Sequence, residues 1–425
     1  MVEQAGPIKQ TTLDNGLTII SERMEHVRSA TVGIWVRSGS RHEAAPLNGI
    51  SHFIEHTLFK GTRNRTSREI AVESDAIGGH VDAFTSREVA SYYVKVLDEH
   101  LPRAFDLLAD LVTAPLFADE ELDRERNVVT EEIKMVEDTP DDLVHEVFVA
   151  NFWPDHPLGR SILGTVDTLA TFNHDAVKNY FSDIYVPRNL VVAGAGNLDH
   201  ERFVDMVGGY LSGLEDRPVN LKASAPSHAS RRIVLDKDLE QAHLLLGTCC
   251  PSMTSADRYT VHVLNVILGG GMSSRLFQTI REDRGLAYAV YSGVNSYTDA
   301  GYLSVYAATS PEQLTDVIKL STEEFNKLKQ EPVSDLELER AKGQLKVSIM
   351  LSLESTSARM SNLARQEIFF GRQFTLDEIL ERIEKVSVAD VQRVARDIFS
   401  DDSQFAITAL GQLGSLDLER ASLAM

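Results

Sequence analysis

Residues 189–198, NLVVAGAGNL, are matched by residues 404–413, QFAITALGQL, at an offset of 215. Two further pairs of segments keep the same order along the chain at an offset of 214: residues 183–185 with 397–399 (DIY and DIF), and residues 122–126 with 336–340 (LDRER and LELER). Any single match of this kind arises easily by chance. Three matches at nearly one offset predict two copies of one fold.

Around these repeats, short strand signals alternate irregularly with helical patterns. Asn15-Gly16 lies between two β-prone runs, a pairing that favours a β-hairpin. Residues 31–36, TVGIWV, predict a buried strand, and residues 91–96, SYYVKV, predict another. Because strands and helices do not alternate one for one, we predict an α+β protein. It should have two homologous domains, each a mostly antiparallel sheet packed with helices.

The boundary between the two copies is predicted from composition. Residues 212–230, SGLEDRPVNLKASAPSHAS, are rich in Pro, Ser and Ala and show little hydrophobic periodicity. This segment predicts a linker between an N-terminal domain, residues 1–211, and a C-terminal domain, residues 231–425.

Composition excludes several classes of protein. The 425 residues include 42 Lys and Arg against 63 Asp and Glu, a net charge of −21, and such an acidic surface repels nucleic-acid phosphates. No apolar run approaches the roughly 18 residues of a membrane span, and the first ten residues resemble no targeting signal. The two cysteines, Cys249 and Cys250, are neighbours, which suits a reducing compartment. We therefore expect a soluble, cytoplasmic protein.

The chemistry-bearing motif is residues 52–56, HFIEH. At about 100° per residue, His52, Glu55 and His56 share one side of a helix, for which Asn48 is a plausible N-cap and Gly61 a plausible stop. Histidines at i and i+4 can direct their imidazoles at one zinc ion. A glutamate beside them can take a proton from a water that the metal activates. On the motif alone, an exposed polar helix face remains an alternative.

A third ligand is predicted in the helix from about residue 119 to 136. Glu125 and Glu132 fall within the apolar stripe that Leu122, Val129 and Val136 define. Carboxylates are rarely buried unless something compensates their desolvation, and a cation does so. Glu132 is therefore the candidate third ligand and Glu125 a second carboxylate nearby. The alternative is a stripe that wraps differently and leaves both acids solvated.

Together these features resemble the pitrilysin/insulinase family of inverzincin peptidases, and most of all its short-chain branch with mitochondrial processing peptidase and bacterial relatives. The resemblance covers nearly the whole chain and rests on four blocks: GISHFIEHTLFKGT (49–62), GGHVDAFTSREVASYYVKVL (78–97), RNVVTEEI (126–133) and GGGMSSRLFQTIREDRGLAYAVYS (269–292). It implies that His52, His56 and Glu132 bind zinc, that Glu55 is the general base and that Glu125 supports the site.

The second copy lacks the ligands. Aligning the two halves places Ser274, Phe277 and Gln278 opposite the three motif residues and Lys346 opposite Glu132. We therefore expect one zinc ion per chain.

The resemblance also implies a substrate site. Arg281 and Tyr288, seven residues apart, correspond to a pair that holds substrate and helps to stabilise the transition state. Asp82, Ala83 and Phe84 lie on a strand that resembles the edge to which the family adds its peptide. Asp82 stands where relatives usually carry Asn, and an ionised carboxylate cannot donate a hydrogen bond.

These features predict a zinc endopeptidase acting on unfolded or small peptides within a dimeric chamber. A homodimer is expected, with a heterodimer with a related chain as the other possibility, and with Arg281 and Tyr288 acting on the zinc site of the other subunit. Two other classes stay open: a non-catalytic peptide-binding or scaffold subunit of the same fold, and a structural zinc protein. A structural site closes with four protein ligands, often Cys.

Overall fold

The computed structural model describes residues 8–221, 224–400 and 404–414. The chain forms two compact units, and each unit is assembled from three separate segments. The first unit comprises Met1–Lys134, Arg160–Ala223 and Leu351–Gln373, and the second comprises Met135–Gly159, Ser224–Met350 and Phe374–Met425.

The first unit is built on a six-stranded sheet with the strand order β1-β2-β6-β3-β5-β4. Its strands are β1 (Ile8–Thr12), β2 (Thr18–Arg23), β3 (Ser29–Val36), β4 (His80–Thr85), β5 (Ala90–Leu97) and β6 (Leu190–Gly196). All neighbours are antiparallel except β2 and β6. The predicted hairpin at Asn15-Gly16 joins β1 to β2, where Gly16 has a φ of +87° that favours glycine. The two predicted strands are confirmed as β3 and β5.

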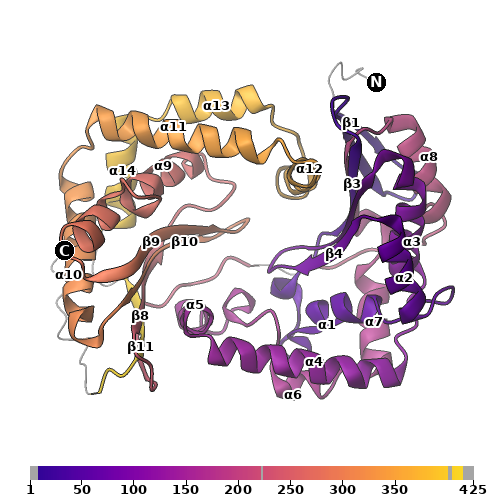
Figure 1. Cartoon of the computed structure of the whole chain (residues 1–425), viewed down its shortest axis with the longest axis horizontal. Helices are drawn as coiled ribbons and strands as arrows, with labels where there is room; N and C mark the ends of the chain where they lie inside the picture. Colours follow the sequence, from indigo (N-terminus) through magenta and orange to yellow (C-terminus); the bar gives the residue numbers. More distant parts are fainter. Residues whose placement is uncertain (1–7, 222–223, 401–403, 415–425) are drawn as a thin grey trace. The chain divides into compact units, whose positions relative to one another are not determined.

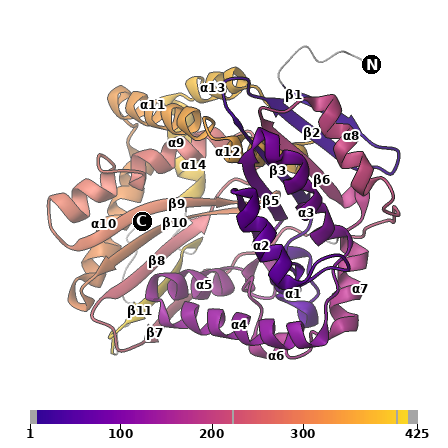
Figure 2. The ribbon, with the colours of Figure 1, turned by 45° about the vertical axis from the view of Figure 1, so that its right-hand side comes forward.

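Helices from the first half of the chain cover one face of this sheet (Figures 1 and 2). They are α1 (Ile50–Leu58), α2 (Ser67–Ile77), α3 (Leu101–Thr113), α7 (His174–Ile184) and α8 (His200–Leu211). The short helix α6 (Val166–Leu169) lies farther from the sheet and adds Leu169 to the core. Helix α4 (Asp119–Asp138) begins in this unit, and its last residues belong to the second unit. The large apolar core lies between this face and these helices and includes Phe53, Phe105 and Leu108, all fully buried.

The second unit repeats this architecture with a five-stranded sheet in the order β7-β11-β8-β10-β9. The strands are β7 (Arg232–Asp236), β8 (Ala242–Cys249), β9 (Ala287–Ser296), β10 (Gly301–Thr309) and β11 (Ala406–Gly411). The helices are α9 (Arg258–Gly269), α10 (Leu314–Gln330), α11 (Asp335–Ser352), α13 (Leu376–Glu384) and α14 (Val388–Ile398). In this sheet β7 and β11 are parallel and the other neighbours are antiparallel. The equivalent pair in the first sheet, β2 and β6, is also parallel. This equivalence confirms the predicted fold: two α+β domains of one architecture.

Each sheet is covered on its other face by a helix from the opposite half of the sequence. Helix α12 (Thr356–Phe370) packs on β2, β3 and β6 of the first unit, where Met360, Leu363 and Ala364 are buried. Helix α5 (Pro140–Phe152) packs on β8 and β11 of the second unit. The two helices begin 216 residues apart, close to the offset of the sequence repeats, and so are equivalent elements that have been exchanged. The compact units are therefore not continuous stretches of the chain.

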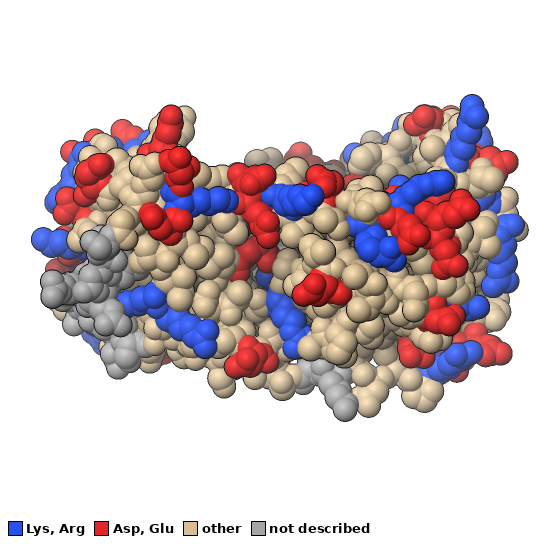
Figure 3. All heavy atoms as spheres, turned by 90° about the horizontal axis from the view of Figure 1, so that it is seen from below, with Lys and Arg blue, Asp and Glu red and all other residues tan. Residues whose placement is uncertain are grey.

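Two further observations bear on the classes that composition excludes. Among the described residues, no helix is long and apolar enough to cross a membrane. On the face of the molecule shown in Figure 3, Lys and Arg side chains are dispersed among Asp and Glu side chains.

Candidate metal centre

Helix α1 presents the H-x-x-E-H motif, and its start is fixed by a buried carboxylate. Glu43 accepts hydrogen bonds from the backbone N–H groups of Gly49 (2.8 Å) and Ser51 (2.9 Å). The side-chain amide of Asn48 also donates to Glu43, so the cap predicted at Asn48 is wrong: the helix begins after Gly49. Gly49 has a φ of +96°, and a Cβ there would lie 2.7 Å from the carbonyl oxygen of Leu163. Glycine is therefore required at this position.

Helix α4 supplies the carboxylates, as its sequence pattern predicts. Leu122 and Val129 are buried on its inner face. Glu125 is buried beside them, and the side chain of Glu132 is 31% exposed. Glu131 lies on the outer, exposed face and pairs with Lys134. The alternative, in which both acids are solvated, is therefore wrong.

His52, His56 and Glu132 converge. The Nε2 atoms of His52 and His56 lie 3.8 Å and 3.6 Å from the two carboxylate oxygens of Glu132. One ligand atom from each of the three residues lies within 4.8 Å of the others, and no other group of metal-ligating side chains in the described part of the chain meets this criterion. Ligands at about 2.0–2.1 Å from a tetrahedral zinc ion lie roughly 3.3–3.4 Å apart, so a small contraction accommodates the ion.

The electrostatics of His52 suit a metal ligand. Burial, with a contribution from the neighbouring His56, lowers the pKa of His52 to about 4, so the ring is neutral at pH 7. Its Nε2 atom faces Glu132. A neutral imidazole offers the lone pair of one ring nitrogen, and this is the form that binds zinc. The donor set therefore fits a zinc ion.

A carboxylate and an amine hold the second histidine in place. The Nδ1 atom of His56 lies 3.2 Å from Glu125, whose other oxygen accepts a hydrogen bond from Lys60 at 2.8 Å. When Nδ1 donates its hydrogen to Glu125, the lone pair of Nε2 faces Glu132. Burial raises the pKa of Glu125, but the hydrogen bonds from His56 and Lys60 outweigh burial and lower it. Glu125 therefore remains ionised.

Glu55, the proposed base, is held from strand β4. The hydroxyl of Thr85 donates a hydrogen bond to Glu55 at 2.5 Å. Burial raises the pKa of Glu55, although the hydrogen bond from Thr85 opposes this. The charges of Glu55 and Glu132 both act on His56, in agreement with a single compact cluster.

The three supporting residues Glu43, Thr85 and Lys60 were not predicted from the sequence. Thr85 and Lys60 lie within the sequence blocks that carry the family resemblance. The sequence does not show, however, that Thr85 contacts Glu55 or that Lys60 contacts Glu125. Glu43 gives no sequence signal, because its capping role depends on the fold of residues 43–51.

The predicted substrate residues lie on β4, which is an edge strand because β5 is its one partner among the strands that the structure describes. Asp82 accepts a hydrogen bond from the hydroxyl of Tyr93 at 2.9 Å. Phe84 packs edge-on against Trp35, with ring centroids 5.4 Å apart. The edge position of the strand is therefore observed, and substrate binding by Asp82, Ala83 and Phe84 stays a prediction.

In the second unit the structure brings Arg281 and Tyr288 together. Arg281 lies near the end of a short π-helix (Phe277–Glu282), and Tyr288 follows in β9. The Arg281 guanidinium lies 5.1 Å from the centroid of the Tyr288 ring and 4.8 Å from that of Phe277. Tyr288 is 78% exposed, so its hydroxyl is available to a ligand. The role of this pair in catalysis stays a prediction.

The second copy has no equivalent of the metal ligands. Lys346, opposite Glu132 in the alignment, forms an ion pair with Glu384 at 2.6 Å. The segment equivalent to α1 contains Ser274, Phe277 and Gln278, of which Gln278 donates a hydrogen bond to the carbonyl of Met272.

Fold and site together define a class: a duplicated α+β protein whose described residues form one candidate metal centre, made by an H-x-x-E-H helix and a glutamate from a second helix. Residues 18–166 match the model of the insulinase family (peptidase family M16), and residues 171–345 match that of the M16 inactive domain. The chain belongs to the M16 insulinase/pitrilysin family, as a single-chain bacterial type with an N-terminal domain and an inactive C-terminal domain.

Bacterial relatives match over almost their full length. A protein of Bacillus subtilis described as an uncharacterized zinc protease is 44% identical over 94% of this chain and 98% of the relative. A Streptomyces coelicolor protein with the same description is 42% identical over 92% of this chain and 87% of the relative. The crystal structure of a protease from Helicobacter pylori shares the fold, with a TM-score of 0.88 at 23% identity, covering 95% of this chain and 99% of that one.

Proposed function

We propose that this protein is a zinc-dependent endopeptidase that hydrolyses peptide bonds in unfolded or small peptides. The observation that carries the proposal is the convergence of His52, His56 and Glu132, with Glu55 on the same helix face. Three protein ligands leave a fourth position open, which is typical of catalytic rather than structural zinc. Family membership and the description of relatives as zinc proteases support the same conclusion.

The chain's own groups account for the proton transfers. Zinc, when bound, activates a water molecule and polarises the carbonyl of the scissile bond. Glu55 accepts the proton of the attacking water and then delivers it to the leaving amine. Thr85 donates to one oxygen of Glu55 and so orients the other. Lys60 and Glu125 hold His56 with its Nε2 lone pair toward the ligand cluster.

Substrate is proposed to bind as an added strand on β4. An edge strand offers unpaired N–H and C=O groups to an extended peptide, which favours unfolded or small substrates. At this edge Asp82 acts as an acceptor, because its carboxylate already receives the hydroxyl of Tyr93. We therefore expect it to pair with a backbone N–H of the peptide.

The working assembly is proposed to be a homodimer that encloses the active sites. Each chain carries one candidate metal centre, in the first unit, and one Arg281–Tyr288 pair, in the second. Arg and Tyr donate hydrogen bonds to a carbonyl or to the oxyanion that develops from it. We propose that each pair acts on the metal centre of the other subunit. The two half-buried free thiols, Cys249 and Cys250, are compatible with a cytoplasmic location.

The decisive experiment is digestion of an unstructured peptide library by zinc-loaded and by chelated protein. We expect cleavage with zinc alone, and about one zinc ion per chain. Glu55→Gln should keep the metal and lose roughly 10²–10⁴-fold in rate. The matched control Glu131→Gln, on the exposed face of α4, should cleave normally. A metal-loaded protein without cleavage would favour the scaffold subunit, and full activity of Glu55→Gln would refute the mechanism.

A further inference from the structure

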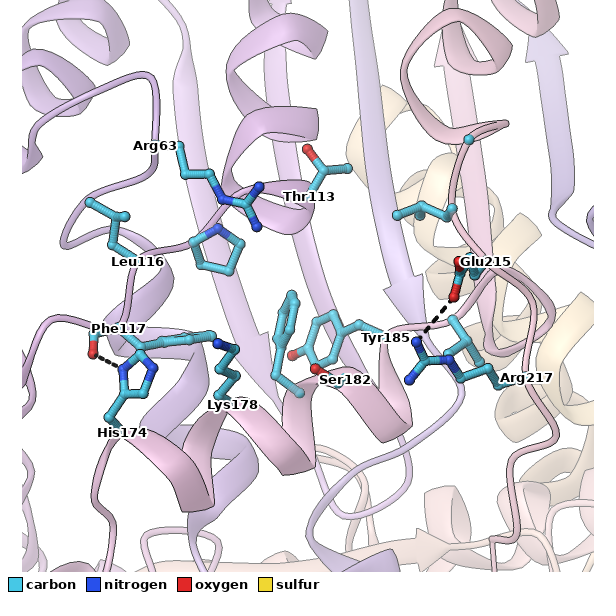
Figure 4. Close-up of a pocket in the computed structure, with 15 residues that line it drawn as sticks. Arg63, Thr113, Leu116, Phe117, His174, Lys178, Ser182, Tyr185, Glu215 and Arg217 are labelled. Atoms are coloured by element: carbon cyan, nitrogen blue, oxygen red, sulfur yellow. Dashed lines mark hydrogen bonds and ion pairs between the residues drawn. The ribbon is translucent and has the colours of Figure 1, made fainter.

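A pocket of about 480 Å³ lies in the first unit and contains none of the motif residues. One wall is helix α7, which carries Lys178 and Ser182. Arg63 lies across the pocket from this helix, and residues 213–217 close another side (Figure 4). Ligand pockets have volumes of about 300–1,000 Å³, so this one is large enough for an amino acid or a dipeptide.

The pocket carries an excess of positive charge. The side chains of Arg63 and Lys178 form no ion pair or hydrogen bond with any residue that the structure describes, although the chain has 63 acidic residues. A third cation, Arg217, is paired with Glu215 at 3.1 Å, so that pair contributes little net charge. Arg63 and Lys178 are both exposed, and two such cations on opposite walls of one pocket, in a protein of net charge −21, favour an anion as its ligand.

Beside these cations the wall is aromatic. Phe181 stacks on Tyr185 with ring centroids 4.2 Å apart and meets Phe117 edge-on at 5.3 Å. A ligand in this pocket therefore meets charge on one part of its surface and aromatic carbon on another. Inorganic phosphate would use only the first of these features.

The backbone at the pocket wall is strained. Phe117 has a φ of +50°, a left-handed conformation that is unusual for a bulky residue. Its carbonyl oxygen accepts a hydrogen bond from Nδ1 of His174 at 2.9 Å, which leaves Nε2 of that ring to serve as an acceptor. Such strain costs about 1–3 kcal/mol and is concentrated at binding sites.

We propose that this pocket binds a small organic carboxylate with an aromatic or aliphatic body. The Arg63 guanidinium presents parallel N–H groups to both oxygens of a carboxylate, and Lys178 adds a point charge. The apolar body packs on Phe181 and Tyr185. Two sources share this chemistry, the C-terminal end of a short peptide and a free organic acid. The proposal does not rest on the proposed peptidase activity.

The test uses the full chain treated with EDTA, so that no metal can hold the carboxylate. Titration calorimetry would compare two acids, the dipeptide N-acetyl-Ala-Phe and 3-phenylpropionate, each with its neutral amide, and inorganic phosphate. We expect one or both acids to bind at least tenfold more tightly than the corresponding amide. The acid with the lower Kd identifies the source, and phosphate should bind more weakly than either.

Substitutions then place the site. Arg63→Gln and Lys178→Gln should each weaken binding of the preferred acid at least tenfold. Arg103→Gln and Lys95→Gln, at exposed basic residues of the same unit outside the pocket, should leave the Kd unchanged. Melting temperatures near that of the native chain would show that the variants are folded. Equal affinity for acid and amide, equal effects of pocket and control variants, or no binding of either acid would overturn the proposal.

Discussion

Replacing Met360 with alanine tests whether the helix contributed by the second half of the chain stabilises the first unit. Met360 on α12 is 1% exposed, and its sulfur accepts a hydrogen bond from the indole N–H of Trp35 at 3.1 Å. The sulfur would lie 2.9 Å from a Cβ placed at Gly33, so the side chain fills its space tightly. A buried Met→Ala change costs about 2–5 kcal/mol. The orphaned indole adds about 1 kcal/mol, because sulfur is a weak acceptor. We therefore expect a loss of about 4 kcal/mol.

The two tryptophans provide the assay. Trp35 lies in the first unit and Trp153 in the second, so a Trp153→Phe background leaves fluorescence that reports the first unit alone. With an m-value of about 2–3 kcal/mol/M in urea, Met360→Ala should lower the midpoint by about 1–2 M. The control is Met350→Ala on α11, where the side chain is 49% exposed and the change should stay within about 0.5 kcal/mol. Equal midpoints for the two variants would refute the role assigned to α12.

Three further predictions address the metal site, pH and assembly. Glu125→Gln should weaken zinc binding about 10–100-fold in a competition titration, whereas Glu131→Gln should not. Equal zinc affinities of the two variants would show that Glu125 does not support the metal centre. Burial raises the pKa of the Asp110 carboxyl. The hydrogen bonds that Thr62, Asn64 and Arg65 donate to it outweigh burial and lower this pKa below its ordinary value of 3.8. The stabilisation from its carboxylate is therefore present above pH 3.8 and lost as pH falls below that value. The deficit in unfolding free energy of Asp110→Asn should accordingly be larger at pH 6 than at pH 3, and a deficit independent of pH would contradict this. Finally, mixing Glu55→Gln chains with Tyr288→Phe chains should restore activity toward half of the native value per dimer if the tyrosine acts across subunits, and no recovery despite proven subunit exchange would exclude that arrangement.

Features that depend on local chemistry were predictable from the sequence. The hairpin at Asn15-Gly16 follows from turn preferences, and β3 and β5 follow from their apolar, β-branched composition. The inward placement of Glu125 and Glu132 on α4 follows from helical periodicity, because Leu122 shares their face. Each of these predictions needs only the residues within one element.

Features that depend on distant segments were not predictable in this way. Glu43 caps α1 only because residues 43–51 fold back on themselves, and Thr85 reaches Glu55 only because β4 lies beside α1. The exchange of α5 and α12 is hidden for a further reason. Each helix has the composition of a helix that packs on a sheet, and nothing in its own residues specifies which of two similar sheets it covers. A linker-like composition indicates where one sequence repeat ends. The compact units have other boundaries, because each contains a helix from the other repeat.

The exchanged helices have a consequence for the origin of this chain. A single repeat folding alone would have a sheet with one bare face and a helix with no sheet to cover. In two copies of that repeat, the helix of each copy would cover the bare sheet face of the other, as in domain-swapped dimers. The duplicated chain thus has the connectivity of a domain-swapped pair whose two subunits are joined in one polypeptide. Residues 1–230 and 231–425, produced as separate polypeptides, should accordingly be insoluble alone and form a soluble complex when co-expressed. Independent folding of either piece would show that the swap is dispensable.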